Sequence, residues 1–199
     1  GQDGSYLSKL LLENNYKVYA AAPRSSHDYL IRHRILKIDK DLHHIPLDVT
    51  ELFQIFEVVN KYKFDEVYNL AAQSFVGISW DNPFATSTVN ALGTLNLLDA
   101  IKRFSPRTKF YQASTSEMFG LVREPIQSEQ TPFYPRSPYG VSKLFAHAMT
   151  VNYRESFDLF ACSGILFNHE SPLRPRRFVT QKIIQKSNKN DEHYEKCWK

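Results

Sequence analysis

Tyr139 and Lys143 are the residues whose types and spacing most directly suggest chemistry. They stand four residues apart at the start of an apolar-periodic segment that runs to about Phe157, which predicts a helix with both side chains on one face. Ser137 is expected to cap this helix, and Pro138 suits its first turn. An ammonium near a phenol lowers the phenol's pKa from its ordinary value near 10, so the pair could take a proton from a sugar hydroxyl while a nicotinamide takes the hydride. Alone the pair is a weak signal, because such pairs usually form a solvated helix face.

Two glycines, Gly1 and Gly4, precede a helical pattern over residues 5–13. Glycines that open a helix let a phosphate approach its N-terminus, where free N–H groups and the helix dipole favour an anion. A simple turn is the alternative interpretation of this spacing.

A strand pattern over residues 17–22 leads to Arg24, Ser25 and Ser26. Strands at this position in NAD-binding sheets usually end in an acidic residue that holds the ribose, whereas an arginine accommodates a 2′-phosphate. The three residues therefore favour NADP over NAD. The alternative is an ordinary polar loop.

Strand and helix patterns alternate along the rest of the chain. We expect strands at 42–46, 65–72, 109–113 and 159–167, and helices at 51–61, 83–104 and 139–157, with Thr50 capping the first of these helices. This alternation predicts a parallel sheet with helices on both faces, which is a Rossmann-like, doubly wound α/β fold.

Ligands bind such sheets at the carboxyl ends of the strands. Polar residues gather at these ends in the sequence, at Gln73 and Ser74, at 115–117 and at 168–169. Two more features fit a cofactor there: the small side chains of 71–72 let a flat ring lie close to the backbone, and Asp48 could face an adenine. A plain turn is an equal interpretation for Asp48.

Composition limits the classes of protein that the chain could represent. It has 199 residues, of which 42% are hydrophobic, which suffices for one core. The net charge is +4, and the basic residues are spread along the chain. A site for an anionic nucleotide cofactor and a nucleotide-sugar would account for several of them, so we expect no nucleic-acid partner. The sequence has no long apolar run, signal peptide or metal-ligand spacing, and two cysteines fit a reducing compartment. We therefore expect a cytoplasmic protein without a membrane or metal partner.

Several stretches, taken together and in order, resemble one family. They are Gly1-Gln-Asp-Gly-Ser-Tyr-Leu7, Val67-Tyr-Asn-Leu-Ala-Ala-Gln-Ser74, Phe110-Tyr-Gln-Ala-Ser-Thr-Ser-Glu117, Thr131-Pro-Phe-Tyr-Pro-Arg-Ser-Pro-Tyr-Gly140, Val151-Asn-Tyr-Arg-Glu155 and Gly164-Ile-Leu-Phe-Asn-His-Glu-Ser-Pro172. From residue 1 to about 184, the chain resembles the GDP-mannose 4,6-dehydratases of the extended short-chain dehydrogenase/reductase family.

The resemblance implies an internal redox dehydration of GDP-mannose. Tyr139, assisted by Lys143, would deprotonate the 4-hydroxyl as C4 is oxidised with NADP, and Thr115 would hydrogen-bond that oxygen. Glu117 would remove the C5 proton and donate a proton to the departing C6 hydroxyl, and hydride would return to C6. The product would be GDP-4-keto-6-deoxymannose.

The resemblance also implies binding residues. The contacts to NADP would be Gly1, Gln2, Asp3, Arg24, Ser25, Ser26, Asp48, Val49, Leu70, Ala71, Ala72, Gln73, Ser74, Tyr139, Lys143, His169 and Arg174. The contacts to GDP-mannose would be Ser74, Ser116, Glu117 and Asn168. Relatives form dimers or tetramers, so a homo-oligomer is expected for the full-length protein.

The sequence lacks the first strand of this fold and most of the C-terminal substrate domain. We expect a partial dinucleotide-binding domain over residues 1–185 and a polar tail over 186–199. Because the first strand is central in the order 3-2-1-4-5-6, its neighbours should lack their shared partner.

Two other functions stay open on the sequence. One is a nucleotide-sugar epimerase or another dehydratase on the same fold, although an epimerase has no use for an acid or base at C5 and C6 such as Glu117. The other is an inactive, truncated copy that binds NADP or a full-length partner.

Overall fold

A computed structural model of the chain describes residues 1–24 and 30–187. The residues fall into two compact units. Among the described residues, the first comprises Gly1–Val18, Leu30–Leu42 and 169–187, and the second comprises 19–24 and 43–168.

The second unit contains all five strands that the structure describes. They are β1 (Tyr19–Ala22), β2 (His43–Pro46), β3 (Glu66–Asn69), β4 (Lys109–Thr115) and β5 (Ala161–Leu166). The helical segments of this unit are α3 (Leu52–Tyr62), α4 (Val76–Asp81), α5 (Pro83–Ser87), the π-helical turn η1 (Thr88–Leu92), α6 (Gly93–Phe104), the 3₁₀ turn η2 (Ser116–Met118) and α7 (Pro138–Phe157). Every strand expected from the sequence is present, with ends shifted by a few residues.

All strand pairs are parallel, as the alternating pattern predicts. β1 pairs with β2, and β4 pairs with β3 on one side and β5 on the other. In the order 3-2-1-4-5-6 these are strands 3-2 and 4-5-6, and no described strand occupies the central position between β1 and β3. The α/β doubly wound fold is therefore confirmed, with its sheet in two parts.

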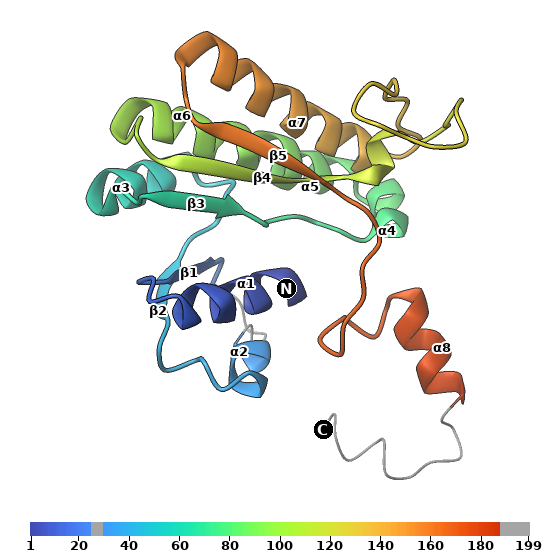
Figure 1. Cartoon of the computed structure of the whole chain (residues 1–199), viewed down its shortest axis with the longest axis horizontal. Helices are drawn as coiled ribbons and strands as arrows, with labels where there is room; N and C mark the ends of the chain where they lie inside the picture. The colour runs from blue at the N-terminus through green and yellow to red at the C-terminus, as the bar shows by residue number, and fades with distance from the viewer. Residues whose placement is uncertain (25–29, 188–199) are drawn as a thin grey trace. The chain divides into compact units, whose positions relative to one another are not determined.

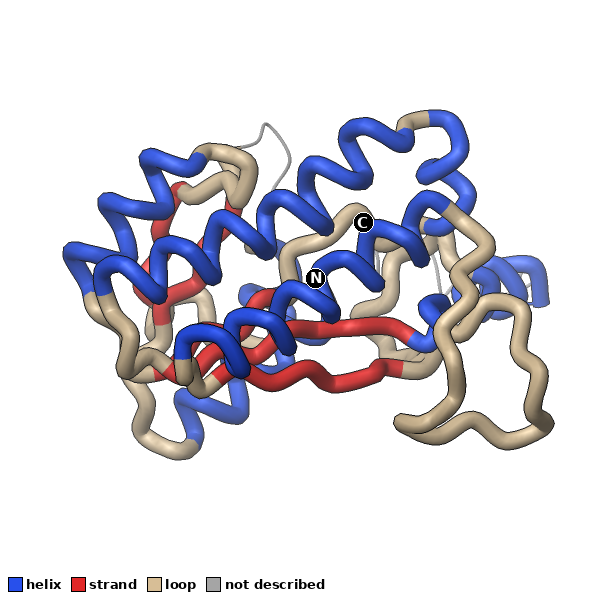
Figure 2. Tube along the Cα trace, turned by 90° about the horizontal axis from the view of Figure 1, so that it is seen from above, coloured by secondary structure: helices blue, strands red, loops and turns tan. Residues whose placement is uncertain are grey.

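Helices α6 and α7 lie over one face of the β3–β4–β5 sheet (Figure 1) and run lengthwise along its strands when viewed from above (Figure 2). Helix α3 packs against α6, and α7 packs against β4 and β5. The apolar side chains between these elements form the core of the unit: Ile45, Leu47, Ile55, Val59, Leu97, Leu98, Ala100, Ile101, Phe110, Tyr153, Leu159 and Ala161.

Two local expectations are corrected by the structure. The helix expected over 83–104 is interrupted by the π turn η1, because its buried Asn90 is hydrogen-bonded to residues of two other segments. Thr50 does not cap α3. It donates both its N–H and its hydroxyl to Asp48 Oδ1, and Glu51 occupies the cap position without a side-chain bond.

Residues 119–137 link η2 to α7 as a loop beyond the end of β4, yellow in Figure 1 and tan in Figure 2. Gly120 adopts a φ of +54°, and a Cβ atom on it would collide with the carbonyl oxygen of Tyr134. The close return of the loop at this point therefore requires a glycine.

The first unit contains three helices among the described residues: α1 (Gln2–Glu13), α2 (Ile31–Ile35) and α8 (Val179–Ser187). The start of the expected tail, 186–187, belongs to α8, and 188–199 fall outside the described residues. No helix in the described ranges combines the length and apolarity needed to cross a membrane.

Candidate active site

Thr115 and Glu117 lie at the carboxyl end of β4. Thr115 is the last residue of the strand and is buried, and its Oγ1 accepts a hydrogen bond from the Glu117 N–H at 3.2 Å. This bond caps η2 and fixes the backbone at Ser116 and Glu117, whose side chains are half-buried. The structure gives the Glu117 carboxylate no hydrogen bond or ion pair within the described residues.

Helix α7 begins beside this strand end. Its cap is the expected one, since Ser137 Oγ accepts from the Gly140 N–H at 3.0 Å and Pro138 lies in the first turn. A Cβ atom on Gly140 would lie 2.8 Å from the carbonyl oxygen of Glu117. The first turn of α7 therefore packs directly on the backbone of η2, which brings the segments carrying Glu117 and Tyr139 together.

Tyr139 and Lys143 are both buried, with relative exposures of 8% and 3%. The Lys143 ammonium has no hydrogen-bond partner among the described residues. Burial lowers its pKa to about 8, because desolvation penalises the charged form. The ammonium thus remains mostly protonated at neutral pH, as a cation that must assist a neighbouring phenol should.

A buried network of polar side chains connects α7 to the loop after β3. Ser142 Oγ donates to the Tyr139 carbonyl at 2.7 Å and accepts from Asn90 Nδ2 at 3.0 Å. Asn90 also donates to the Gln73 carbonyl and accepts from the Gln73 N–H. The helix that carries Tyr139 is therefore held to a predicted cofactor contact, Gln73. Sequence reasoning missed Asn90 and Ser142, for which no local pattern gives a signal.

Other predicted cofactor residues of the second unit follow the strands as expected. Asp48 follows β2, with one oxygen used in the turn to Thr50, and the Val49 side chain packs against Gly93 at the start of α6. Arg24 is exposed just beyond β1, whereas Ser25 and Ser26 lie outside the described residues. The remaining members, which form the irregular segment after β3, are Leu70, Ala71, Ala72, Gln73 and Ser74.

Further predicted residues belong to the first unit, where some of them meet. His169 Nε2 lies 2.8 Å from Asp3 Oδ1, and Gln2 Nε2 donates to the His169 carbonyl at 3.2 Å. Gly1 precedes this turn of α1 and is exposed. Arg174 is paired with Glu170 at 3.5 Å and stacks on Phe178 at 3.6 Å, so its guanidinium already has two partners.

Asn168, a predicted substrate contact, is exposed two residues beyond β5 in the second unit. The structure thus groups Thr115, Glu117, Tyr139 and Lys143, and separately Gln2, Asp3 and His169. The roles of all these residues remain predictions.

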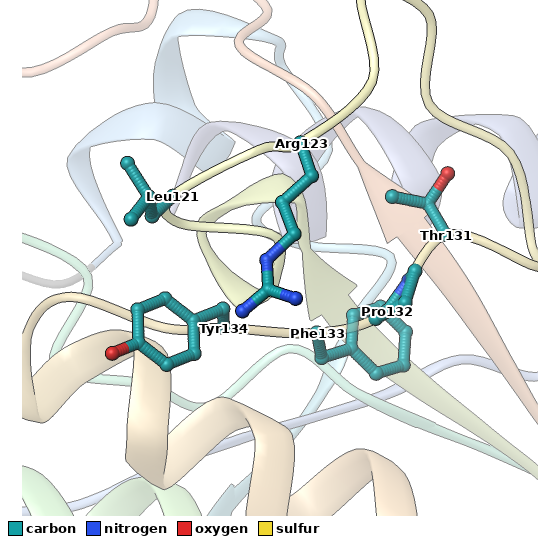
Figure 3. A pocket seen from close by; sticks show the side chains of 6 residues that line it. All are labelled: Leu121, Arg123, Thr131, Pro132, Phe133 and Tyr134. Carbon is teal, nitrogen blue, oxygen red and sulfur yellow. The ribbon is translucent and has the colours of Figure 1, made fainter.

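A small hollow in the 119–137 loop is lined by none of the predicted residues. The Arg123 side chain extends into it between the rings of Phe133 and Tyr134 (Figure 3). This hollow is not the candidate active site, because it contains neither the Tyr139 phenol nor the Glu117 carboxylate that the chemistry needs.

Among residues 1–24 and 30–187, no group of three or more histidine, cysteine, aspartate or glutamate side chains could hold a metal ion.

Comparison with known proteins decides the family. A sequence profile described as GDP-mannose 4,6 dehydratase matches residues 1–199, which is the whole chain. The chain belongs to the GDP-mannose 4,6-dehydratase family. The family assignment predicted from the quoted stretches is therefore confirmed.

Relatives of known name agree with this assignment. The GDP-mannose 4,6-dehydratase of Vibrio cholerae serotype O1 is 47% identical over 206 residues, covering 99% of this chain and 55% of that protein. The human GDP-mannose 4,6 dehydratase is 48% identical over 191 residues, covering 92% and 51%. The chain therefore spans about half the length of these relatives.

Two solved structures are similar to this chain in fold. A dTDP-glucose 4,6-dehydratase from Streptomyces venezuelae with NAD and TYD bound matches with a TM-score of 0.81 at 20% identity, covering 94% of this chain and 59% of that chain. The structure named RMD from Pseudomonas aeruginosa, complexed with NADPH, matches with a TM-score of 0.65 at 28% identity, covering 73% and 51%. At 20% identity the first of these matches supports the fold alone.

Proposed function

We propose that the protein containing this chain is a GDP-mannose 4,6-dehydratase that uses NADP. One observation carries the proposal beyond family membership: the first turn of α7, with Tyr139 and the buried Lys143, packs on the strand end that holds Thr115 and Glu117. A phenol, an ammonium, a hydroxyl and a carboxylate in adjoining segments are the groups that the dehydration requires.

The residues present fit a dinucleotide cofactor. The Lys143 ammonium is buried without a hydrogen-bonding partner in the described chain, as suits a group that binds a polar ligand. Arg24 is an exposed cation beyond β1, where a 2′-phosphate would need one. When bound, NADP would accept hydride from C4 of the sugar and return it to C6. The preference for NADP over NAD is supported by Arg24 alone.

The first role of the chain's own residues is at the sugar 4-hydroxyl. The Lys143 ammonium stabilises the phenolate of Tyr139, which takes the hydroxyl proton as C4 becomes a ketone. The Thr115 hydroxyl hydrogen-bonds the same oxygen and orients it. The burial of all three side chains strengthens their electrostatic interactions, because water is excluded.

The second role belongs to Glu117. The C4 ketone makes the C5 proton acidic, and the carboxylate of Glu117 removes it. The same group, now protonated, gives its proton to the C6 hydroxyl, which leaves as water. When hydride returns to C6, C5 must take up a proton, and this balances the proton that Tyr139 removed from the 4-hydroxyl. Glu117 is suited to both steps because the structure shows no competing hydrogen bond or ion pair to its carboxylate within the described ranges. Homo-oligomer formation and a cytoplasmic location remain predictions.

Turnover of GDP-mannose by the full-length protein with NADP⁺ tests this proposal. We expect the 4-keto-6-deoxy product, and we expect Glu117→Gln to lower its rate of formation by at least about 100-fold, since the base and acid are lost together. Glu129→Gln, at an exposed loop position, is the matched control and should leave the rate unchanged. A wild-type protein that binds NADP but forms no product would support the inactive-copy alternative instead.

A further inference from the structure

A hydrogen bond joins β4, the strand that ends in Thr115, to α7, the helix that carries Tyr139, at residues that the mechanism above does not use. Ser114 Oγ lies 3.0 Å from His147 Nδ1, although the two residues are 33 positions apart in the chain. Ser114 is buried and immediately precedes Thr115 on β4. His147 lies on α7 one helical turn beyond Lys143, so Tyr139, Lys143 and His147 follow one another at intervals of four residues.

The surroundings of His147 keep its ring in place. The ring meets Phe133 edge-on, with centroids 5.4 Å apart, and Phe133 packs in turn on Phe119 at 5.2 Å. Burial, and then the charge of Arg154, lower the pKa of His147 below its usual range. A neutral imidazole has one donor and one acceptor nitrogen, and either can pair with a serine hydroxyl.

We propose that His147 is a positioning residue, which sets the placement of the Tyr139-bearing helix against Thr115 through its hydrogen bond to Ser114. This inference rests on the proposed function. The hydrogen bonds of Ser142 hold α7 near its first turn, and the bond to His147 holds it further along. The helix is thus attached to η1 at Ser142 and to β4 at His147, and these two hydrogen bonds restrict its sliding and rotation over β4. Misplacement of reacting groups by about 1 Å can lower the rate by up to about 100-fold. Holding α7 in place therefore preserves the position of Tyr139 and, with it, the rate of the reaction.

Steady-state kinetics of the full-length protein on GDP-mannose provide the first test. Ser114→Ala removes one partner of the bond, and His147→Phe removes the other while keeping a ring against Phe133. We expect each variant to lower kcat by about tenfold with little change in KM, because geometry in the transition state is disturbed and not substrate binding. The double variant should be no slower than either single variant, since all three lack the same bond.

His147→Asn is the conservative variant. Its side-chain amide can place a nitrogen or oxygen where Nδ1 lies, so we expect it to restore kcat to within about twofold of wild type. Losses that multiply in the double variant, a change in KM in place of kcat, or an asparagine variant as slow as His147→Phe would each overturn the proposal.

Nitrogen NMR of the His147 ring, without added nucleotide, gives a readout that does not depend on turnover. We expect Ser114→Ala to shift the Nδ1 resonance, and an unchanged resonance would show that the bond is absent. If wild-type protein does not convert GDP-mannose, the proposed function fails and the catalytic role of His147 fails with it. If wild-type protein is active and the variants match it, only the role of His147 is refuted.

Discussion

The side-chain amide of Asn90 donates a hydrogen bond to the hydroxyl of Ser142 over 3.0 Å, linking a π-helical turn to the helix that carries Tyr139. Asn90 is 1% exposed, and its amide also satisfies both backbone groups of Gln73. Asn90 therefore connects the predicted cofactor loop to the helix that carries Tyr139, and both its amide hydrogens and its amide oxygen are hydrogen-bonded.

This network of hydrogen bonds predicts a large effect of a nearly isosteric substitution. Asn90→Asp replaces the donating NH₂ by an oxygen and leaves the Gln73 carbonyl facing a buried acceptor. We expect the free energy of unfolding to fall by about 3 kcal/mol, because a buried charge loses its hydration without gaining a partner. Urea denaturation measures this, with Asn60→Asp on the exposed side of α3 as the matched control. Equal stabilities of the two variants would contradict the network.

The buried ammonium of Lys143 should make the free energy of unfolding rise with pH in the alkaline range. Its pKa is about 8 in the folded protein and 10.5 as an ordinary lysine, so the unfolded chain binds more protons between these values. The penalty of the buried charge is complete below pH 8 and disappears as the pH rises toward 10.5. Removing the charge should therefore stabilise the protein at neutral pH while abolishing activity.

Lys143→Met isolates this contribution, because methionine keeps an unbranched side chain without the charge. Relative to this variant, wild-type protein should gain about 1 kcal/mol of unfolding free energy per pH unit between the two pKa values, measured in urea without added nucleotide. Lys40→Met, at an exposed position, should show no such trend. A difference between wild type and Lys143→Met that stays constant with pH would mean that the ammonium is not desolvated.

A side chain at Gly164 on β5 should destabilise the protein by a steric clash, and a second substitution at Tyr111 should relieve part of it. A Cβ atom at this position would collide with the hydroxyl of Tyr111 on the neighbouring strand β4 and lie 2.9 Å from the ring carbon that bears it. Gly164→Ala should cost about 2 kcal/mol of stability, because the tyrosine ring must shift within a packed sheet.

The same substitution in a Tyr111→Phe background should cost less, since the colliding oxygen is gone. Thermal unfolding of the four proteins gives both costs. If Gly164→Ala is equally harmful with phenylalanine at 111, the clash is not the cause of the loss.

The sequence predicts those parts of the structure that local chemistry controls. The start of α7 was predictable because Ser137 and Pro138 act within their own turn. The strands were predictable from apolar runs, and their parallel pairing follows from the alternation with helices. The family resemblance adds the grouping of Thr115 and Glu117 with Tyr139, which no spacing rule supplies.

Other features depend on residues far apart in the chain. The π turn at Asn90 is held by partners 17 and 52 positions away, and the bond between Asp3 and His169 spans 166 positions. The hydrogen bond between Ser114 and His147 is a further example, because no local sequence pattern at either residue indicates its partner. The sequence predicts Thr50 as a helix cap because a threonine before a helix usually is one, whereas here its N–H and hydroxyl bond to Asp48 Oδ1 in a turn and Glu51 occupies the cap position.

The central claim is that Tyr139 acts in the oxidation at C4 and Glu117 in the loss of water. It is tested most directly by identifying the nucleotide-sugar that accumulates with each single variant. Full-length Glu117→Gln, loaded with NADP⁺ and quenched after mixing with GDP-mannose, should yield a nucleotide-sugar that has lost two hydrogens but no water, because oxidation at C4 proceeds and elimination stops. Tyr139→Phe should yield unchanged GDP-mannose. Mass spectrometry distinguishes these species from the wild-type product, which has lost one water. A Glu117→Gln protein that forms the dehydrated product at the wild-type rate, or a Tyr139→Phe protein that still oxidises the sugar, would contradict the mechanism.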